Sequence, residues 1–343
     1  MGEAEQLLIS GAVMTLRDVT PADSHEVLRL HQRVFGSTAD EAWFAWKYGQ
    51  GGGAGVAVGA WCDGILVAHC GGLPRTMLYQ GVLQHNLQIG DVMVDPAWRG
   101  LLTRHGPFYH VSKRLYASRL GRDRPYHLGF GFPNARALSL GVKSGLSWDV
   151  GQMMELRWQG SGLSDLPAGS GAGNWLWSAR KLGIESAGFD AAVDSVWRRM
   201  QVKMQGLVVG ERHAAYVRWR FAKRPGHDSV FLQVSRPWQS KALGVCVLSL
   251  GLEAQPWLHW LDWIGPPELM AVACALCRAE AARAGALGLT AWASAPVLAY
   301  LKQTGVSAQS EAARISVAAA SAVSLDDARR AGWWLMGGDT DFL

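Results

Sequence analysis

The chain has 343 residues, which exceeds the usual size of one hydrophobic core and suits two domains of ordinary size. Hydrophobic residues make up 49% and charged residues 18%, a composition that excludes intrinsic disorder and allows a folded interior. The net charge of +5, with a pI near 9, is spread along the chain and contains no dense basic run with interleaved aromatic residues. It therefore argues against a nucleic-acid partner and suits phosphorylated small molecules, acidic carrier proteins or anionic surfaces.

Targeting, membrane and metal signals are all expected to be absent. The first ten residues carry two glutamates and no long apolar run, and no stretch approaches about eighteen apolar residues, so we expect a cytoplasmic chain without a signal peptide or a membrane span. Five cysteines form no disulfide framework. Cys274 and Cys277 have metal-type spacing but lie in an alanine-rich helical run with no second pair, so no metal is expected.

In chain order, the first half predicts a strand, two helices, a meander of three strands, a helix, a strand, a helix and a closing strand. Pro21 and the apolar spacing up to Phe35 indicate the first helix. The expected strands are 14–19, 55–61, 65–71, 83–94, 126–130 and 149–158, and the further helices are 41–48, 107–120 and 135–143.

The second half follows the same rhythm after a Gly- and Ser-rich stretch. The expected strands are 230–234, 243–250, 257–264, 287–292, 315–318 and 333–336, and the helices are 268–284 and 295–304. The repeated order favours an internal duplication, with domains over 1–158 and 174–343 and a linker over 159–173. Of the 17 tryptophans, those in strand-like segments such as Trp257, Trp260 and Trp334 suit either a core or an aromatic cleft, and we favour the core.

Two segments carry a family resemblance. The stretch from Gly90 to Gly100 resembles the fourth strand and donor loop of GNAT acyltransferases, and that from Gly129 to Leu146 resembles their fifth strand and following helix. The resemblance covers about residues 14–158, and the second half is similar in element order alone. It implies a fold of the α/β (α+β) class with two tandem GNAT-like domains, each a mixed, mostly antiparallel twisted sheet flanked by helices.

The resemblance also implies a donor site for acetyl-CoA or another acyl-CoA. Backbone N–H groups at the start of a helix, together with its dipole, favour a pyrophosphate. The residues expected to bind the donor are Val92, Met93, Val94, Arg99, Gly100, Thr103, Arg104, His105, Gly106 and Asn134. The chain departs from the family at Leu102 and Arg104, which replace small loop residues. It also departs at Gly141, where many members have a tyrosine that acts as a general acid to the leaving thiolate.

Candidate catalytic and acceptor-binding residues come from both halves. Asp91 is expected to be a general base or to orient the amine, and His85 lies on the same strand. In the second half Pro266 and Pro267 remove backbone donors where phosphate would need them, so this half is expected to have lost donor binding and to shape the acceptor pocket. Its candidates are Asp262 as a catalytic residue and Trp260, Asp339 and Asp341 as substrate-binding residues.

The leading functional hypothesis is acyl transfer to an amine on a small or carrier-linked acceptor, such as an amino sugar or an amino-acid-derived metabolite. Three alternatives remain open. The donor could be an acyl-acyl carrier protein docking on the basic stretch 113–124, whose turnover would be sensitive to salt. The chain could be a Fem-like aminoacyl transferase, although it lacks a strong basic stripe, or a non-catalytic GNAT-like protein that binds CoA or another ligand.

Overall fold

A computed structural model describes residues 3–36, 39–49, 54–99, 105–160, 176–251, 256–318 and 325–342. The predicted linker lies almost wholly outside these ranges, as do Gly100, Thr103 and Arg104 of the predicted donor loop. Contacts divide the chain into two compact units. Unit 1 comprises Met1–Thr76, Gln84–Val150 and Arg314–Arg330, and unit 2 comprises Met77–Leu83, Gly151–Ala313 and Ala331–Leu343.

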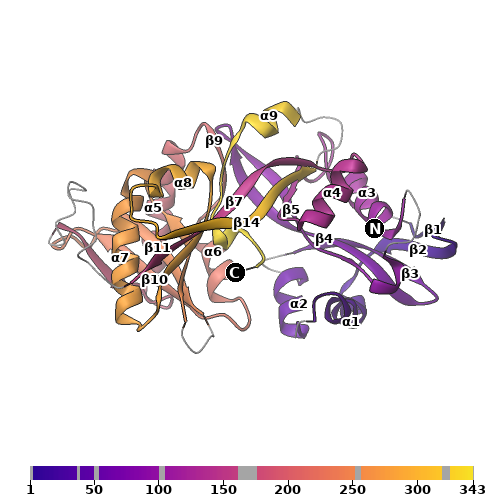
Figure 1. The fold of residues 1–343 in the computed structure, drawn as a ribbon, viewed down its shortest axis with the longest axis horizontal. Helices are drawn as coiled ribbons and strands as arrows, with labels where there is room; N and C mark the ends of the chain where they lie inside the picture. The colour runs from indigo at the N-terminus through magenta and orange to yellow at the C-terminus, as the bar shows by residue number, and fades with distance from the viewer. Residues whose placement is uncertain are drawn as a thin grey trace. The chain divides into compact units, whose positions relative to one another are not determined.

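Unit 1 is a mixed sheet with helices on both faces (Figure 1). Its strands are β1 (Glu5–Ile9), β2 (Ala12–Asp18), β3 (Val56–Cys62), most of β4 (Ile65–Tyr79), most of β5 (Val82–Val94), β6 (Gly129–Gly131) and the end of β14 (Ala308–Ala318). Its helices are α1 (Ser24–Phe35), α2 (Glu41–Tyr48), α3 (Pro107–Arg119), α4 (Ala135–Lys143) and α9 (Leu325–Arg330). Strands β1 to β4 pair antiparallel in sequence order, β5 pairs parallel with β6, and β6 pairs antiparallel with β14.

Two apolar layers cover the faces of the unit 1 sheet. Helices α1 and α2 pack with Trp61, Leu66 and Met93 on one face. Helix α3 packs through Val111 and Leu115 on the other. Local signals set the helix ends, because Asp40 caps α2 by accepting a hydrogen bond from the Trp43 amide at 2.8 Å and Gly36 ends α1 in the left-handed conformation at φ 66°.

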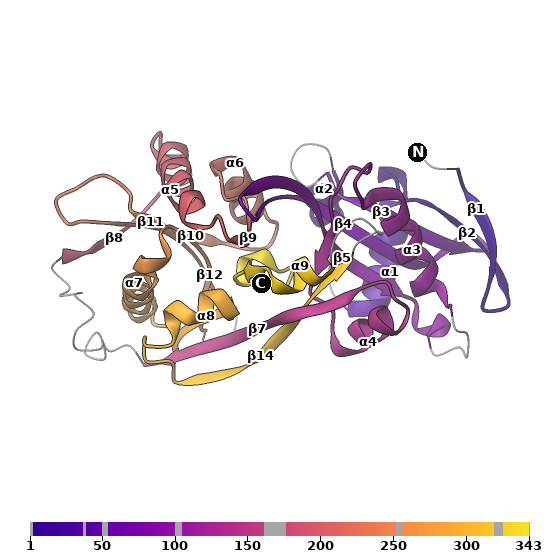
Figure 2. The ribbon, with the colours of Figure 1, turned by 90° about the horizontal axis from the view of Figure 1, so that it is seen from above.

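Unit 2 repeats this arrangement, with α5 and α6 on one side of its central strands and α7 and α8 on the other (Figure 2). Its strands are most of β7 (Trp148–Gln159), β8 (Ser178–Lys181), β9 (Leu207–Gly210), β10 (Ser229–Ser235), β11 (Gly244–Leu250), β12 (Leu258–Ile264), β13 (Gly288–Ser294) and β15 (Gly332–Trp334). Its helices are α5 (Phe189–Lys203), α6 (Ala214–Val217), α7 (Met270–Arg283) and α8 (Ala295–Leu301), and a π-helical turn (Arg218–Ala222) follows α6. Strands β8, β10, β11 and β12 pair antiparallel, and β12 pairs parallel with β13.

One strand from each half pairs with a strand of the other half, namely β7 from the first half and β14 from the second. The sequence suggests that 149–158 closes the first half, yet residues Met153–Gln159 of β7 pair antiparallel with β13 in unit 2. Conversely, Ser316–Ala318 of β14 pair with β6 in unit 1. Long-range contacts decide with which strand a given strand pairs. The local sequence of each strand does not contain this information. The domain boundaries 1–158, 159–173 and 174–343 remain predictions.

The predicted fold class is confirmed: the structure is mixed α/β, with mostly antiparallel sheets flanked by helices. The tryptophan prediction is also settled for the core residues, since Trp158, Trp260, Trp263 and Trp334 are fully buried in unit 2. The Trp263 ring packs directly against Gly244, where any side chain would overlap the ring.

Candidate active site

Strands β5 and β6 part in unit 1. Their parallel pairing runs from Leu87 opposite Gly129 to Ile89 opposite Gly131, where β6 ends. Strand β5 continues to Val94, and within the described residues the stretch Val92–Val94 lies beyond the pairing with β6. The Val94 carbonyl accepts a hydrogen bond from Arg99 Nε at 2.7 Å. Donor binding by this stretch stays a prediction.

A β-bulge interrupts β5 at this point. Leu87 and Ile89 pack into the core on the α3 face, and so do Val92 and Val94. Residues on one face of a strand are normally two apart, so a step of three between Ile89 and Val92 means that one extra residue has been inserted. The backbone agrees, because Asp91 has a left-handed φ of 48° inside the strand. This bulge was not predicted from the sequence, although a glycine inside an apolar strand, such as Gly90, can indicate one.

Helix α3 begins a few residues beyond the end of β5. Gly106 is its N-cap and Pro107 its first residue, so the first turn carries no capping side chain. His105 stacks on Tyr109, with ring centroids 4.1 Å apart. Uncapped N–H groups at a helix start attract anions. His105 and Gly106 lie directly before this helix start, and their part in donor binding stays a prediction.

A buried polar cluster surrounds Asp91. Lys47 Nζ lies 2.9 Å from Asp91 Oδ1, and the two side chains are only 3% and 8% exposed. The Tyr48 hydroxyl donates a hydrogen bond to Asp91 Oδ2. His69 Nδ1 donates to the Asp91 backbone carbonyl at 2.8 Å. The sequence predicted Asp91 but missed these three partners, because α2 and β4 bring them from 22 to 44 residues away.

Burial lowers the pKa of two histidines near this cluster. For His69, desolvation is the largest cause, and the nearby Lys47 adds to it while Asp91 opposes it. His31 on α1 behaves alike, with desolvation again the main cause of the lowered pKa. Both imidazoles therefore favour the neutral form at pH 7.

His85 lies apart from this cluster, and Asn134 has a capping role in the fold. His85 is exposed near the turn between β4 and β5, where its Nδ1 lies 3.3 Å from Thr76 Oγ1. Six residues of strand separate it from Asp91, or about 20 Å. Asn134 is the N-cap of α4, and its side-chain oxygen accepts a hydrogen bond from the Ala137 amide at 2.9 Å.

The candidates predicted in the second half meet at Arg212. Its Nε lies 2.9 and 3.0 Å from the two oxygens of Asp262, and its Nη2 lies 2.7 Å from Asp339. All three side chains are at most 1% exposed. Burial raises the pKa of Asp262 and Asp339 raises it further, whereas Arg212 opposes the rise. Trp260 is also fully buried, and its indole donates to the Asp262 carbonyl at 2.9 Å.

The C-terminal segment is held by its backbone. Arg220 Nε donates to the Gly338 carbonyl at 2.9 Å, and a second nitrogen of Arg220 donates to the Thr340 carbonyl. Arg224 Nη2 lies 3.5 Å from the Asp341 carbonyl. Burial, with Arg220 nearby, lowers the pKa of Arg224 to about 9. Asp339 is thus a buried ion-pair partner, and the substrate-binding roles of Trp260, Asp339 and Asp341 stay predictions.

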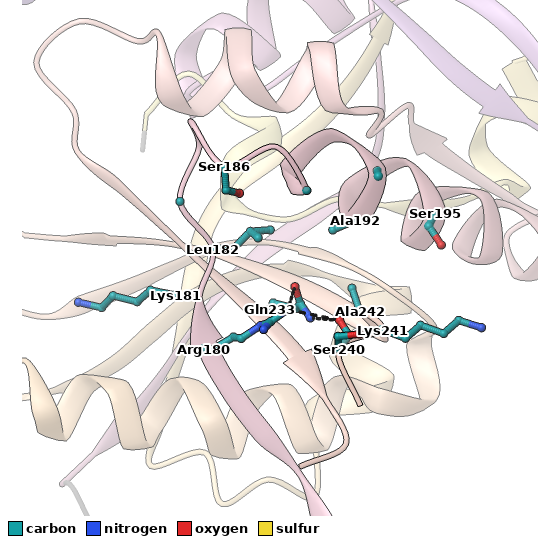
Figure 3. Close-up of a pocket in the computed structure, with 13 residues that line it drawn as sticks. Arg180, Lys181, Leu182, Ser186, Ala192, Ser195, Gln233, Ser240, Lys241 and Ala242 are labelled. Atoms are coloured by element: carbon teal, nitrogen blue, oxygen red, sulfur yellow. Dashed lines mark hydrogen bonds between the residues drawn. The ribbon is translucent and has the colours of Figure 1, made fainter. Parts of the chain in front are cut away.

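A cavity of about 540 Å³ lies elsewhere in unit 2 (Figure 3). Arg180, Lys181 and Lys241 line it, and Lys181 and Lys241 point away from its centre. At its floor, Gln233 Nε2 donates to the Ser240 carbonyl at 2.8 Å. None of the predicted site residues lines this cavity.

Comparison with known proteins identifies one part of the chain. A family model described as an acetyltransferase (GNAT) domain matches residues 15–134, the part of the chain that contains the β5 bulge and the start of α3. Residues 15–134 form a GNAT domain. Among curated protein sequences, none matches the chain.

Solved structures share the GNAT fold over most of the chain. A GCN5-related N-acetyltransferase from Anabaena variabilis is 11% identical with a TM-score of 0.61, over 88% of this chain and 72% of that one. N-myristoyltransferase from Saccharomyces cerevisiae, solved with bound myristoyl-CoA, is 10% identical with a TM-score of 0.58, over 93% and 85%. A tandem GNAT protein from the clavulanic acid biosynthesis pathway is 13% identical with a TM-score of 0.57, over 91% and 100%. The duplicated halves therefore form a tandem GNAT fold.

The described residues contain neither a metal-type cluster nor a membrane-spanning helix. No group of His, Cys, Asp and Glu side chains among them is arranged to hold a metal ion. No helix in the same ranges is long and apolar enough to cross a membrane.

Proposed function

We propose that this protein is an acyl-CoA-dependent N-acyltransferase whose donor binds to the GNAT domain in unit 1. The observation that carries the proposal is the parting of β5 from β6 at Ile89, directly before the bulge at Asp91 and the uncapped start of α3. The family match over residues 15–134 supports acyl transfer in general. A relative in fold with bound myristoyl-CoA supports an acyl-CoA donor, with the chain length left to experiment.

In this proposal the backbone of Val92–Val94 binds the pantetheine arm and polarises the thioester carbonyl, as a fixed N–H donor does for a developing oxyanion. Gly106, His105 and the loop residues Arg99, Gly100, Thr103 and Arg104 bind the phosphates, and Asn134 contacts the arm near α4. The chain would thus recognise the donor mainly through backbone groups and positive charge.

The proposed reaction is direct transfer. The amine nitrogen attacks the thioester carbonyl carbon, a C–N bond forms, the C–S bond breaks and CoA leaves as a thiolate that takes a proton from solvent. Asp91, held by Lys47 and Tyr48, orients the ammonium or accepts its proton through water. Unit 2 shapes the pocket for an amine on a small or carrier-linked molecule, such as an amino sugar or an amino-acid derivative.

Ligand-dependent thermal stabilisation tests the proposal. The chain is heated with acetyl-CoA, longer acyl-CoAs or CoA alone, and a ligand present at a hundred times its Kd should stabilise it by about 2.7 kcal/mol. Arg104→Ala should weaken this shift, whereas Arg122→Ala, an equal loss of charge at an exposed position beyond α3, should not. No shift with any CoA species would contradict the proposal and favour a carrier-protein donor or a non-catalytic role.

A further inference from the structure

Asp91 has an unusual backbone for its place in the fold. Among the described residues, the other non-glycine residues with positive φ are Ser10, Ala54, Asp63 and Gln80. Each of these lies outside a strand and directly before a glycine, where a turn accepts such a conformation. Asp91 lies inside β5, where the left-handed conformation is strained for a side chain with a Cβ. Strain of this kind persists only where the surroundings hold it in place.

Three side chains from two other elements provide that hold. Lys47 and Tyr48, in the last turn of α2, each bind one oxygen of the Asp91 carboxylate. His69, on β4, binds the Asp91 carbonyl. Both the side-chain carboxylate and the main-chain carbonyl of Asp91 are therefore held by hydrogen bonds. Together these bonds restrict the φ and ψ angles of Asp91.

The cluster is closely packed against Gly71 on β4. A Cβ at Gly71 would overlap the Tyr48 hydroxyl and would lie 3.0 Å from His69 Cε1 and 3.2 Å from the Gly90 carbonyl. The rings of Tyr48 and His69 meet edge to face, with centroids 5.9 Å apart. Lys47 Nζ also lies 5.1 Å from the centroid of the Trp43 ring. The cluster is thus packed as well as hydrogen-bonded.

We propose that Lys47, Tyr48 and His69 are positioning residues that hold Asp91 in its left-handed conformation and thereby aim the backbone of Val92–Val94 at the donor. The bulge moves Val92 to the face that Leu87 and Ile89 occupy, so the direction of every N–H and C=O group after Asp91 depends on it. The inference rests on the proposed function, because it assigns these backbone groups to the pantetheine arm of an acyl-CoA.

The donor itself offers a way to test this, because its two ends would meet different parts of the site. Adenosine 3′,5′-bisphosphate carries the 3′-phosphate and one phosphate of the pyrophosphate expected at α3 but no pantetheine arm, whereas CoA and acetyl-CoA carry the whole pyrophosphate and the arm. A change that misdirects Val92–Val94 should weaken binding of CoA and acetyl-CoA and leave the nucleotide unaffected. A change that merely unfolds unit 1 should weaken all three.

The experiment measures the Kd of these three ligands for Tyr48→Phe and Lys47→Met in the full chain. Loss of a hydrogen bond to a charged group should weaken CoA and acetyl-CoA about tenfold. The nucleotide should bind as before. Tyr300→Phe and Lys302→Met, at exposed positions of unit 2, are the matched controls and should change nothing.

Substitution of Asp91 itself separates conformation from charge. Glycine adopts a left-handed φ without strain and alanine does not. Asp91→Gly should therefore bind CoA more tightly than Asp91→Ala, and adding Tyr48→Phe to Asp91→Gly should cost nothing more. Equal Kd values for the glycine and alanine variants, or unchanged CoA binding in Tyr48→Phe and Lys47→Met, would overturn the inference. If the wild-type chain binds none of the three ligands, the proposed function fails instead.

Discussion

Arg212 carries the counter-charge for two buried carboxylates, Asp262 and Asp339. Arg212→Met would leave both of them buried without a cation, so the free energy of unfolding should fall by about 3–5 kcal/mol. Urea denaturation followed by tryptophan fluorescence measures the change. Lys203→Met, which breaks the exposed pair with Glu268, should cost less than about 1 kcal/mol. Equal, small losses in the two variants would show that the Arg212 cluster does not stabilise unit 2.

Asp23 gives unit 1 a predictable dependence on pH. Two hydrogen bonds from Arg17, at 2.7 and 2.8 Å, are the largest cause that lowers the pKa of Asp23 from 3.8 to about 2. A lowered pKa in the folded state means that this stabilisation, about 2 kcal/mol, is present above pH 3.8 and is lost as the pH falls towards 2. Denaturation of the wild type and Asp23→Asn should differ most at pH 5 and progressively less towards pH 2.5. A difference independent of pH would contradict this assignment.

At the scale of elements, local signals predicted most of the GNAT domain. Asp40, Pro107 and Asn134 each mark a helix start that the structure contains. The short strand β8 and the helix α5 were missed. For α5 the signal was present in the sequence, because its buried apolar residues have helical spacing: Phe189, Val193, Val196, Trp197 and Met200. The partners of Asp91 were missed for another reason. They come together only when α2 and β4 pack in the folded chain, and their spacing in the sequence does not predict this contact.

Substitutions of Asn134, the N-cap of α4, can separate a structural role from a role in donor binding. Its side chain caps α4, so Asn134→Ala should cost about 1 kcal/mol of stability, whereas Asn134→Ser keeps a capping oxygen and should cost little. Both variants lose the amide NH2 group. If Asn134 also contacts the donor, both should therefore bind CoA more weakly despite their different stabilities, as ligand titration and denaturation would reveal together. Full CoA affinity in Asn134→Ser would restrict Asn134 to capping.

For the whole molecule, the exchange of β7 and β14 means that neither half of the sequence contains a complete sheet. A specific protease site introduced within residues 161–175 would divide the chain into pieces that each need a strand from the other. After cleavage the two pieces should co-elute from a size-exclusion column and separate only in denaturant. Separation under native conditions would contradict the strand pairing.

The central claim is that the protein binds one acyl-CoA per chain, in unit 1. Calorimetric titration of the full chain with acetyl-CoA, or with the acyl-CoA that stabilises it most, measures this stoichiometry directly. The account predicts one site, weakened in Arg104→Ala and unchanged in Arg122→Ala, because Pro266 and Pro267 occupy the corresponding place in unit 2. Two equivalent sites per chain would show that unit 2 also binds the donor, and no binding would contradict the claim itself.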